Sequence, residues 1–378
     1  MTESTPAVTV LNPPALQANF ALVAGHGDDV AQYFYGALFM RHPETRSLFP
    51  TSMNAQRDRL LTALLRIVAD VDRISELAPY LADLGRDHRK FGAIAEHYPA
   101  VGEALITTLA HFTGQAWTED LEQNWTAAYE VIAGVMTGAA ASAERTEPAW
   151  YEGEIVEVDR RTFDIAALRV RTTQRVPYLA GQSLAVEAST LRPRQWRPFT
   201  PGSAPGGYEF DLHVRAVDGG TVSTALVRAA QPGDRIRLGT PYGRMILDRE
   251  STRPVLMIAG GTGLAPMKAM VGQLVVDGGR PANLYFGART MRENYDDREL
   301  GILAAANEWL TVVTAISADS RWPGASGLVG DVAVAAGDWS EHDVYVCGSP
   351  GMVEHTVKSL VAAGVRENQI SFEEFGKG

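Results

Sequence analysis

The sequence is poor in three features that would point to particular classes of protein. It has a single cysteine, Cys347, among 378 residues, so no disulfide can form within the chain, which suits a reducing compartment. Positive charge is scarce, and the net charge of -11 argues against nucleic acids and anionic membranes as partners. No apolar run approaches the roughly 18 residues that span a bilayer, and no basic-then-apolar signal segment opens the chain. We therefore expect a cytoplasmic protein without a membrane span.

The N-terminal third has the apolar spacing of helices. Between Leu16 and Ala143, apolar residues recur every three or four positions, and glycines and prolines cluster between the periodic runs. Leu81, Leu84 and His88 stand at i, i+3 and i+7, so a helix places the imidazole on the same face as the leucines. A buried imidazole needs partners for both ring nitrogens, and one of them could be a metal or a cofactor iron. An ordinary core histidine is the alternative.

Further aromatic and polar residues follow a characteristic spacing in this helical third. In chain order they are Phe34-Tyr35, Phe49, Gln56, Leu60, His88 and the run at 98–103. Together these residues resemble the globin domain of the flavohemoglobins. The resemblance implies a haem b whose iron is bound by His88 and whose porphyrin packs against Phe49. It also implies that Tyr35 donates a hydrogen bond to bound dioxygen in a pocket shaped by Gln56 and Leu60, where an apolar setting strengthens the bond.

Two positions near the histidine depart from this family pattern. The family's glutamate is Ala140 here, and the lysine that precedes the proximal histidine is Asp87. The resemblance implies that Tyr98 and that glutamate form a relay that orients the histidine, so its loss should weaken electron donation to the haem more than haem binding. Glu144 lies one turn further on and could substitute only if the last helix shifts.

The spacing changes after the helical third. Positions 137–148 are rich in alanine, glycine and threonine and end at Pro148, which predicts a domain boundary between 147 and 148. Alternating apolar and polar residues then predict short strands of a small antiparallel barrel, at 151–158, 163–171, 183–188 and 208–217.

Two motifs in the barrel suit a flavin nucleotide. Residues 197–200 (Arg-Pro-Phe-Thr) combine a positive charge with an aromatic ring, and residues 219–223 precede a short helix that we expect to start near Thr224. A helix N-terminus offers free N–H groups to a pyrophosphate. In this order the motifs resemble the FAD-binding domain of the ferredoxin-reductase superfamily. The resemblance implies FAD contacts from Ser183, Arg197, Pro198, Phe199, Thr200, Gly220, Val222 and Ser223. Both Phe199 and Ser183 stand where the family pattern has a tyrosine: Phe199 keeps the aromatic face but loses the hydroxyl, and Ser183 loses the aromatic ring. We therefore expect looser FAD binding.

From position 251 strands and helices alternate, which predicts a parallel sheet. The expected strands are 255–259, 283–287, 311–316 and 344–347, with a helix at 267–276. The turn at 260–266 (Gly-Gly-Thr-Gly-Leu-Ala-Pro) lets phosphate approach the backbone at a helix start. It resembles the nicotinamide-binding turn of the same superfamily, which implies NAD(P)H contacts from Gly261, Thr262, Gly263, Leu264, Ala265 and Pro266. Residues 347–350 (Cys-Gly-Ser-Pro) resemble the superfamily's nicotinamide-side turn, which implies a contact from Cys347. Cys347 alone could equally be a small buried hydrophobe.

Charged residues after the second of these strands leave two interpretations open. Arg289 and Arg292 could bind the 2′-phosphate of NADPH, or they could belong to a solvated surface, so the choice between NADH and NADPH stays open. The pair at 296–297 is expected to be surface. At the chain end, residues 372–376 (Phe-Glu-Glu-Phe-Gly) resemble the family terminus, which implies that Phe375 covers the flavin and Glu373 lies between flavin and haem.

These observations predict a multidomain protein: an all-α globin at 1–147, an antiparallel FAD barrel at 148–250 and an α/β nicotinamide domain at 251–378. The resemblance implies a monomer that passes electrons from NAD(P)H through FAD to haem, where dioxygen converts nitric oxide to nitrate. The departures from the family pattern leave two alternative functions open. In one, the flavin and haem oxidise another donor, such as a small hydroxy acid. In the other, the protein is a haem-based oxygen or redox sensor.

Overall fold

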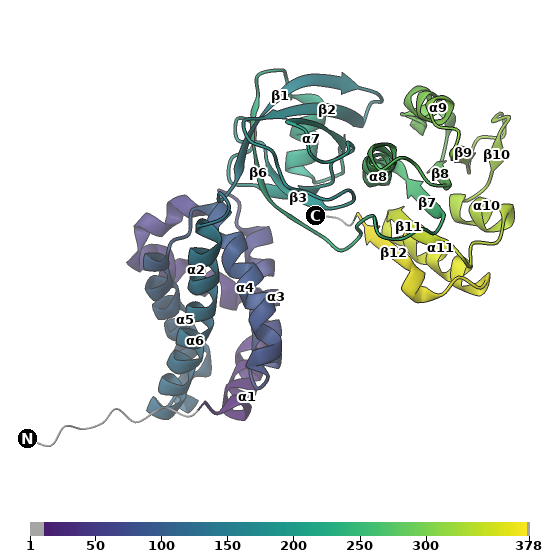
Figure 1. The fold of residues 1–378 in the computed structure, drawn as a ribbon. Helices are drawn as coiled ribbons and strands as arrows, with labels where there is room; N and C mark the ends of the chain where they lie inside the picture. Colours follow the sequence, from purple (N-terminus) through teal and green to yellow (C-terminus); the bar gives the residue numbers. More distant parts are fainter. Residues whose placement is uncertain (1–10, 376–378) are drawn as a thin grey trace, which may run out of the picture. The chain divides into compact units, whose positions relative to one another are not determined.

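The chain divides into two compact units, Met1–Ala149 and Trp150–Gly378. A computed structural model describes residues 11–375, so Gly376 of the terminal motif lies outside the described residues. The first unit is helical and the second contains two sheets (Figure 1). Within residues 11–375, no helix has the length and apolar character needed to cross a membrane.

In the described part of the first unit, residues 11–149, the α-helices are α1 (Pro13–Ala24), α2 (Asp28–Arg41), α3 (Asn54–Ala69), α4 (Ile74–His88), α5 (Tyr98–Thr113) and α6 (Glu119–Glu144). Their starts follow from local chemistry. Asn12 caps α1 by accepting from the Ala15 N–H, and Thr118 caps α6 by accepting from the Leu121 N–H. Prolines occupy the first turn of α1 and of α5, where a missing N–H costs nothing.

The histidine-bearing helix packs tightly on the last helix of this unit. A Cβ added at Gly85 of α4 would lie 2.2 Å from the carbonyl oxygen of Met136 in α6, so only glycine permits this approach. Leu81 of α4 is fully buried, and Leu84 packs against the same cluster as Met136. This contact fixes the end of α4, and therefore the position of His88.

The second unit begins with a six-stranded antiparallel sheet of order β4-β3-β6-β1-β2-β5. Its strands are β1 (Tyr151–Arg160), β2 (Ile165–Thr172), β3 (Ser183–Glu187), β4 (Trp196–Phe199), β5 (Glu209–Arg215) and β6 (Arg235–Tyr242). A bridge between Pro201 and Leu212 joins its two ends, so the sheet curves into the expected barrel. Helix α7 (Thr221–Arg228) packs on β5. The sequence did not predict β6, and α7 begins three residues before the expected Thr224.

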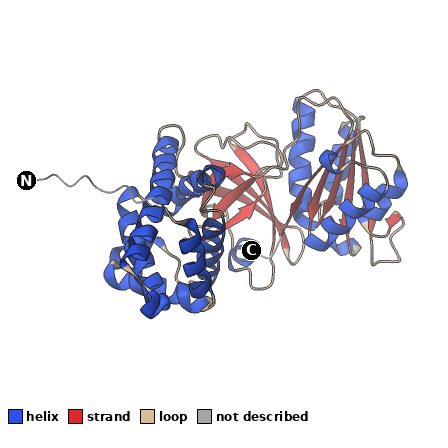
Figure 2. Cartoon of the chain, turned by 90° about the horizontal axis from the view of Figure 1, so that it is seen from below, coloured by secondary structure: helices blue, strands red, loops and turns tan. Residues whose placement is uncertain are grey.

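A six-stranded parallel sheet of order β10-β9-β8-β7-β11-β12 forms the rest of this unit. Its strands are β7 (Val255–Gly260), β8 (Ala282–Ala288), β9 (Leu310–Ile316), β10 (Ala325–Ser326), β11 (Asp343–Gly348) and β12 (Ile370–Glu374). The helices are α8 (Leu264–Val276), α9 (Asp297–Ala306), α10 (Val329–Ala336) and α11 (Pro350–Ala362). Figure 2 shows helices on both sides of this sheet.

Burial on both faces explains the unbroken apolar run of β7. Val255 and Met257 pack in one cluster with α8 and α9, whereas Leu256 and Ile258 pack in another with α10 and α11. The expected helix at 267–276 begins earlier, at Leu264, directly after the glycine turn. Strand β12 was not predicted; it pairs with β11 and brings the chain end to the sheet.

The expectation that 296–297 is surface is wrong for Asp296. Its side chain is 0% exposed and forms ion pairs with Arg161, in the turn between β1 and β2, and with Lys268 of α8. The neighbouring Tyr295 also makes a hydrogen bond to the barrel. Its hydroxyl lies 2.8 Å from Nδ1 of the buried His213 in β5. These contacts join the barrel to the parallel sheet.

Candidate functional site

His88 has the protonation and orientation that an iron ligand needs. It ends α4, and its Nδ1 lies 2.7 Å from the carbonyl oxygen of Leu84. A carbonyl only accepts, so Nδ1 carries the hydrogen and Nε2 keeps its lone pair. Burial holds the pKa of His88 below its ordinary value and so favours the neutral ring. Among the described residues Nε2 has no hydrogen-bond partner, so His88 fits the haem iron.

Tyr35 of α2 is a buried hydrogen-bond donor in the same unit. It is 5% exposed, and its ring contacts Phe39 and Phe49 at centroid distances of 5.7 and 5.4 Å. Burial raises the pKa of Tyr35 to about 12, so the hydroxyl stays protonated at neutral pH. It reaches the Gln56 carbonyl only at 3.5 Å. A bond of that length is weak, so the donor is available to a ligand.

Phe49 and Gln56 contact this tyrosine, and Leu60 packs against the same core cluster. Phe49 and Leu60 pack against the core cluster that contains Tyr35, and the backbone of Gln56 faces the tyrosine hydroxyl. The structure therefore brings the expected distal residues together, although Gln56 contributes its carbonyl rather than its side-chain amide to the bond with Tyr35.

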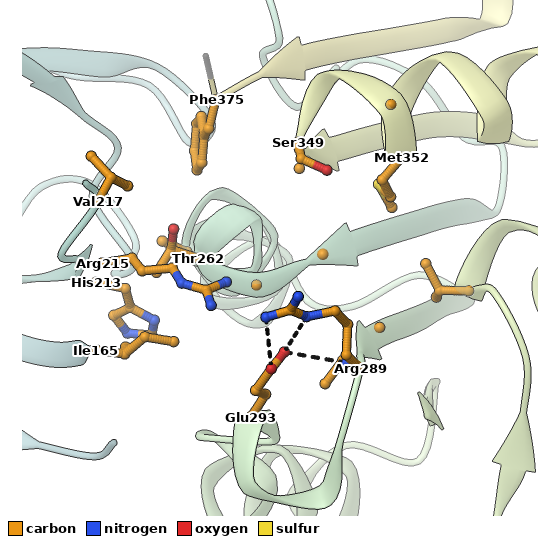
Figure 3. A pocket seen from close by; sticks show the side chains of 18 of the residues that line it. Ile165, His213, Arg215, Val217, Thr262, Arg289, Glu293, Ser349, Met352 and Phe375 are labelled. Carbon is orange, nitrogen blue, oxygen red and sulfur yellow. Dashed lines mark hydrogen bonds and ion pairs between the residues drawn. The ribbon is translucent and has the colours of Figure 1, made fainter. Parts of the chain in front are cut away.

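A cleft of about 750 Å³ lies in the second unit and is lined from both sheets (Figure 3). Its volume suits a small-molecule site. The expected residues that line it are Arg197, Pro198, Phe199, Thr200, Gly220, Val222, Ser223, Gly261, Thr262, Ala265, Arg289 and Phe375. Six other residues that were expected to contact FAD or NAD(P)H do not line it: Ser183, Gly263, Leu264, Pro266, Cys347 and Glu373.

The glycine turn after β7 fits a phosphate for a steric reason. A Cβ on Gly263 would lie 2.3 Å from the Cys347 carbonyl oxygen, so glycine lets the turn press against β11. Gly261 adopts a φ of 54°, in the left-handed region. Gly261 and Thr262 open toward the cleft at the start of the 13-residue helix α8, where backbone N–H groups and the helix dipole attract anions.

Comparison with known proteins agrees with this arrangement. Family models match in order: Globin at residues 32–136, Oxidoreductase FAD-binding domain at 152–246 and Oxidoreductase NAD-binding domain at 257–358. A flavohemoprotein of Chromobacterium violaceum is 27% identical over 394 residues, which cover 96% of each chain. The chain belongs to the flavohemoglobin family.

Two further matches bear on the fold and on the reductase half of this flavohemoglobin. The crystal structure of a flavohemoglobin from Malassezia yamatoensis, with bound FAD and heme, has a TM-score of 0.75 at 20% identity and covers 96% of this chain and 98% of its own. The ferredoxin--NAD(P)(+) reductase component of the naphthalene 1,2-dioxygenase system of Pseudomonas putida is 33% identical over 233 residues, covering 60% of this chain and 69% of its own. The protein is an NAD(P)H oxidoreductase that uses haem and FAD, and electrons pass between these groups.

On the proximal side, this flavohemoglobin lacks the side-chain relay of its family. Tyr98 begins α5 beside the cluster of Leu81 and Met136, and its carbonyl accepts from the Tyr129 hydroxyl at 2.5 Å. Within residues 11–375, no carboxylate is bonded to the Tyr98 hydroxyl, and Glu144 lies exposed at the end of α6. The Leu84 carbonyl is the partner that orients His88 instead. A backbone partner leaves no signal in the sequence.

A lysine remains near the histidine despite the change at position 87. Asp87 forms an ion pair with Lys90, whose side chain is largely buried. The Lys90 ammonium also lies 5.0 Å from the centroid of the Phe91 ring. The positive charge that the family pattern places before His88 therefore follows the histidine in this chain.

Ser183 replaces an aromatic residue and connects two other expected residues. Its Oγ lies 2.7 Å from Oγ1 of Thr200, which lines the cleft, and it donates to Oε1 of Glu373 at 2.9 Å. Burial raises the pKa of Glu373, and Oε2 of this residue is buried without a hydrogen-bond partner in the described part of the chain. Cys347 is paired with Glu373 across β11 and β12, and burial raises its pKa, so it is an unreactive thiol.

Polar residues that were not singled out in the sequence also line the cleft, among them His213, Arg215 and Glu293. His213 and Arg215 come from β5, and Arg215 donates to Asp164 at 2.7 Å. Figure 3 places both on one side of the cleft, with Met352 and Ser349 opposite. The third is Glu293, which pairs with Arg289. His213 and Arg215 lie within a predicted strand and Glu293 follows Arg292, so each was near a recognised segment, but only the fold shows that their side chains reach the cleft.

Proposed function

We propose that this flavohemoglobin is a nitric oxide dioxygenase driven by NAD(P)H. When bound, haem supplies the iron at which dioxygen and nitric oxide meet, and FAD divides the two electrons of a hydride into single electrons. Two electrons suffice to convert two molecules each of nitric oxide and dioxygen into two nitrate ions. The observation that carries the proposal is the Tyr35 hydroxyl, a buried, protonated donor whose only bond in the described residues is the weak one to Gln56.

The chain's own residues have separate roles in this proposal. His88 is the proximal ligand through Nε2, with Leu84 holding its ring. Tyr35 stabilises negative charge that develops on dioxygen, since a donor acts strongly where water is excluded. Phe49 and Leu60 keep the surroundings apolar. In the second unit, the cleft holds the flavin and the nicotinamide cosubstrate through its glycine turn and the 197–200 motif.

The test is consumption of nitric oxide by the protein loaded with haem and FAD, in aerated buffer with NADH or NADPH, with nitrate measured as the product. Tyr35→Phe should lower the rate at limiting oxygen by about 10- to 100-fold, the usual worth of a hydrogen bond to a charged group. Tyr33→Phe is the matched control, because Tyr33 lies on the same helix but stacks on His111 with a centroid distance of 4.1 Å. A loaded protein that consumes no nitric oxide would refute the proposal.

A second candidate rests on the missing carboxylate beside Tyr98. A histidine held by one backbone carbonyl donates less electron density than one held by a charged relay. In this candidate the haem is reduced through the flavin but serves as an oxygen or redox sensor. Rapid haem reduction by NADH or NADPH without nitrate formation would favour the sensor over the dioxygenase.

A further inference from the structure

The parallel sheet defines which end of the cleft receives which part of a dinucleotide. Strand order reverses between β7 and β11, and ligands of such sheets bind outside the carboxyl ends of the strands at this point. The glycine turn after β7 takes the pyrophosphate. The nicotinamide must reach the flavin side, where Phe375 donates its backbone N–H to Gly348 after β11. The adenosine ribose therefore falls to the ends of β8 and β9.

An ion pair occupies that end of the cleft. Arg289 directly follows β8 and donates from Nη2 to Oε1 of Glu293 at 3.0 Å and from Nε to Oε2 at 3.3 Å. The backbone N–H of Arg289 reaches Oε2 at 3.4 Å. The arginine side chain is 71% exposed and that of Glu293 only 25%, so the carboxylate is the more buried partner. Figure 3 shows this pair away from Phe375.

The other cations near the ribose end do not offer a free positive charge. His355 also lines the cleft, but its Nε2 lies 2.7 Å from Oδ1 of Asp331. Arg292, the second arginine considered from the sequence, is exposed and is not among the described residues that line the cleft. A 2′-phosphate would therefore meet a carboxylate and an arginine already paired with it.

We propose that Glu293 makes this chain select NADH over NADPH. The carboxylate accepts a hydrogen bond from a free ribose 2′-hydroxyl, repels a 2′-phosphate and holds Arg289 in its own ion pair. This inference rests on the nicotinamide-binding part of the proposed function and not on the chemistry at the haem. The sequence left open whether Arg289 binds the 2′-phosphate of NADPH. In this proposal Arg289 binds Glu293 and becomes a phosphate ligand only when that carboxylate is removed.

The experiment compares two fragments that differ only in the 2′-phosphate. Calorimetric titration of the protein loaded with haem and FAD should show that 5′-AMP binds roughly 10-fold or more tightly than 2′,5′-ADP. Glu293→Gln should bring the two affinities together or reverse their order, because Arg289 is then free. Arg289→Gln should have the opposite effect and increase the preference for 5′-AMP, since the carboxylate remains alone.

Asp277→Asn is the matched control. Asp277 forms a similar two-pronged pair with Arg249, but neither residue lines the cleft. This variant should leave the ratio of the two affinities unchanged. Tighter binding of 2′,5′-ADP by the parent protein, or an unchanged ratio in Glu293→Gln, would overturn the inference.

A second readout separates this inference from the dioxygenase proposal. Anaerobic flavin reduction, followed by the loss of flavin absorbance, needs neither oxygen nor nitric oxide. It should be faster with NADH than with NADPH at equal low concentrations in the parent protein, and the difference should shrink in Glu293→Gln. A protein that keeps this selectivity but makes no nitrate would refute the dioxygenase and leave the role of Glu293 standing.

Discussion

The helical unit and the two-sheet unit hold their functional side chains by different means. In the helical unit the partners are backbone carbonyls: Leu84 for His88, Gln56 for Tyr35, and Tyr98 for Tyr129. In the two-sheet unit the partners are other side chains, as in the pairs Arg161–Asp296, Arg215–Asp164, Arg289–Glu293 and Ser183–Glu373.

This difference explains how the helical unit tolerates the loss of the family's glutamate. A carbonyl of a helix persists whatever side chain stands at that position, so His88 keeps an orienting partner although Ala140 replaces the glutamate of the family. A side-chain pair lacks this tolerance, because removing one partner leaves the other buried and unsatisfied. Single substitutions should therefore be more disruptive in the second unit than in the first.

The largest expected effect is that of Asp296→Asn. Asp296 is completely buried and pairs with both Arg161 and Lys268, whereas the second carboxylate on Arg161, Asp159, is half exposed. Breaking a buried ion pair by neutralising one partner typically costs about 3–5 kcal/mol of unfolding free energy. Chemical denaturation followed by flavin release should show this loss. Asp297→Asn is the control, because Asp297 is exposed and accepts a hydrogen bond from the side-chain amide of Asn294, so this change should alter stability little. Equal stability of the two variants would contradict a role for this cluster.

The helical unit should be vulnerable through packing rather than through charge. Gly85→Ala places a methyl group against the Met136 carbonyl, so α4 and α6 must separate, at a typical cost of about 1–3 kcal/mol. His88 lies three residues further along α4, so haem should also transfer more readily to an apo-acceptor protein. Gly138→Ala in α6 is the control, because nothing lies within 4 Å of its added Cβ. That change should leave stability equal or slightly raised, since alanine favours helix more than glycine. Faster haem loss from Gly138→Ala than from Gly85→Ala would be the contrary result.

The contacts that hold the functional side chains, whether from backbone carbonyls or from distant side chains, were also the part that the sequence could not predict. Fold class, family and cofactors were predicted correctly because they depend on periodicity and on contiguous motifs such as 197–200 and 260–266. Asp296 was misassigned because a buried carboxylate with two cations looks, in sequence, like any surface acid. Leu84 was missed because its carbonyl, not its side chain, contacts His88. Glu293 was missed because its role depends on where the turn after β8 returns to the cleft. The individual roles assigned to site residues stay predictions.

The smallest expected effect tests the side-chain network at the flavin end of the cleft. Burial raises the pKa of Glu373, and the bond from Ser183 opposes that rise by stabilising the carboxylate. Ser183→Ala removes the bond and should raise the pKa of Glu373 further, so that the carboxyl stays protonated to a higher pH. The midpoint of the pH profile of anaerobic flavin reduction should then move in the alkaline direction, with a loss of about 1–2 kcal/mol in stability. Ser189→Ala is the matched control, since Ser189 makes a similar bond of 3.2 Å to Glu187 but neither residue lines the cleft. A profile that is identical in both variants would mean that Ser183 does not hold Glu373 in solution, and the comparison between backbone-held and side-chain-held sites would then fail at this position.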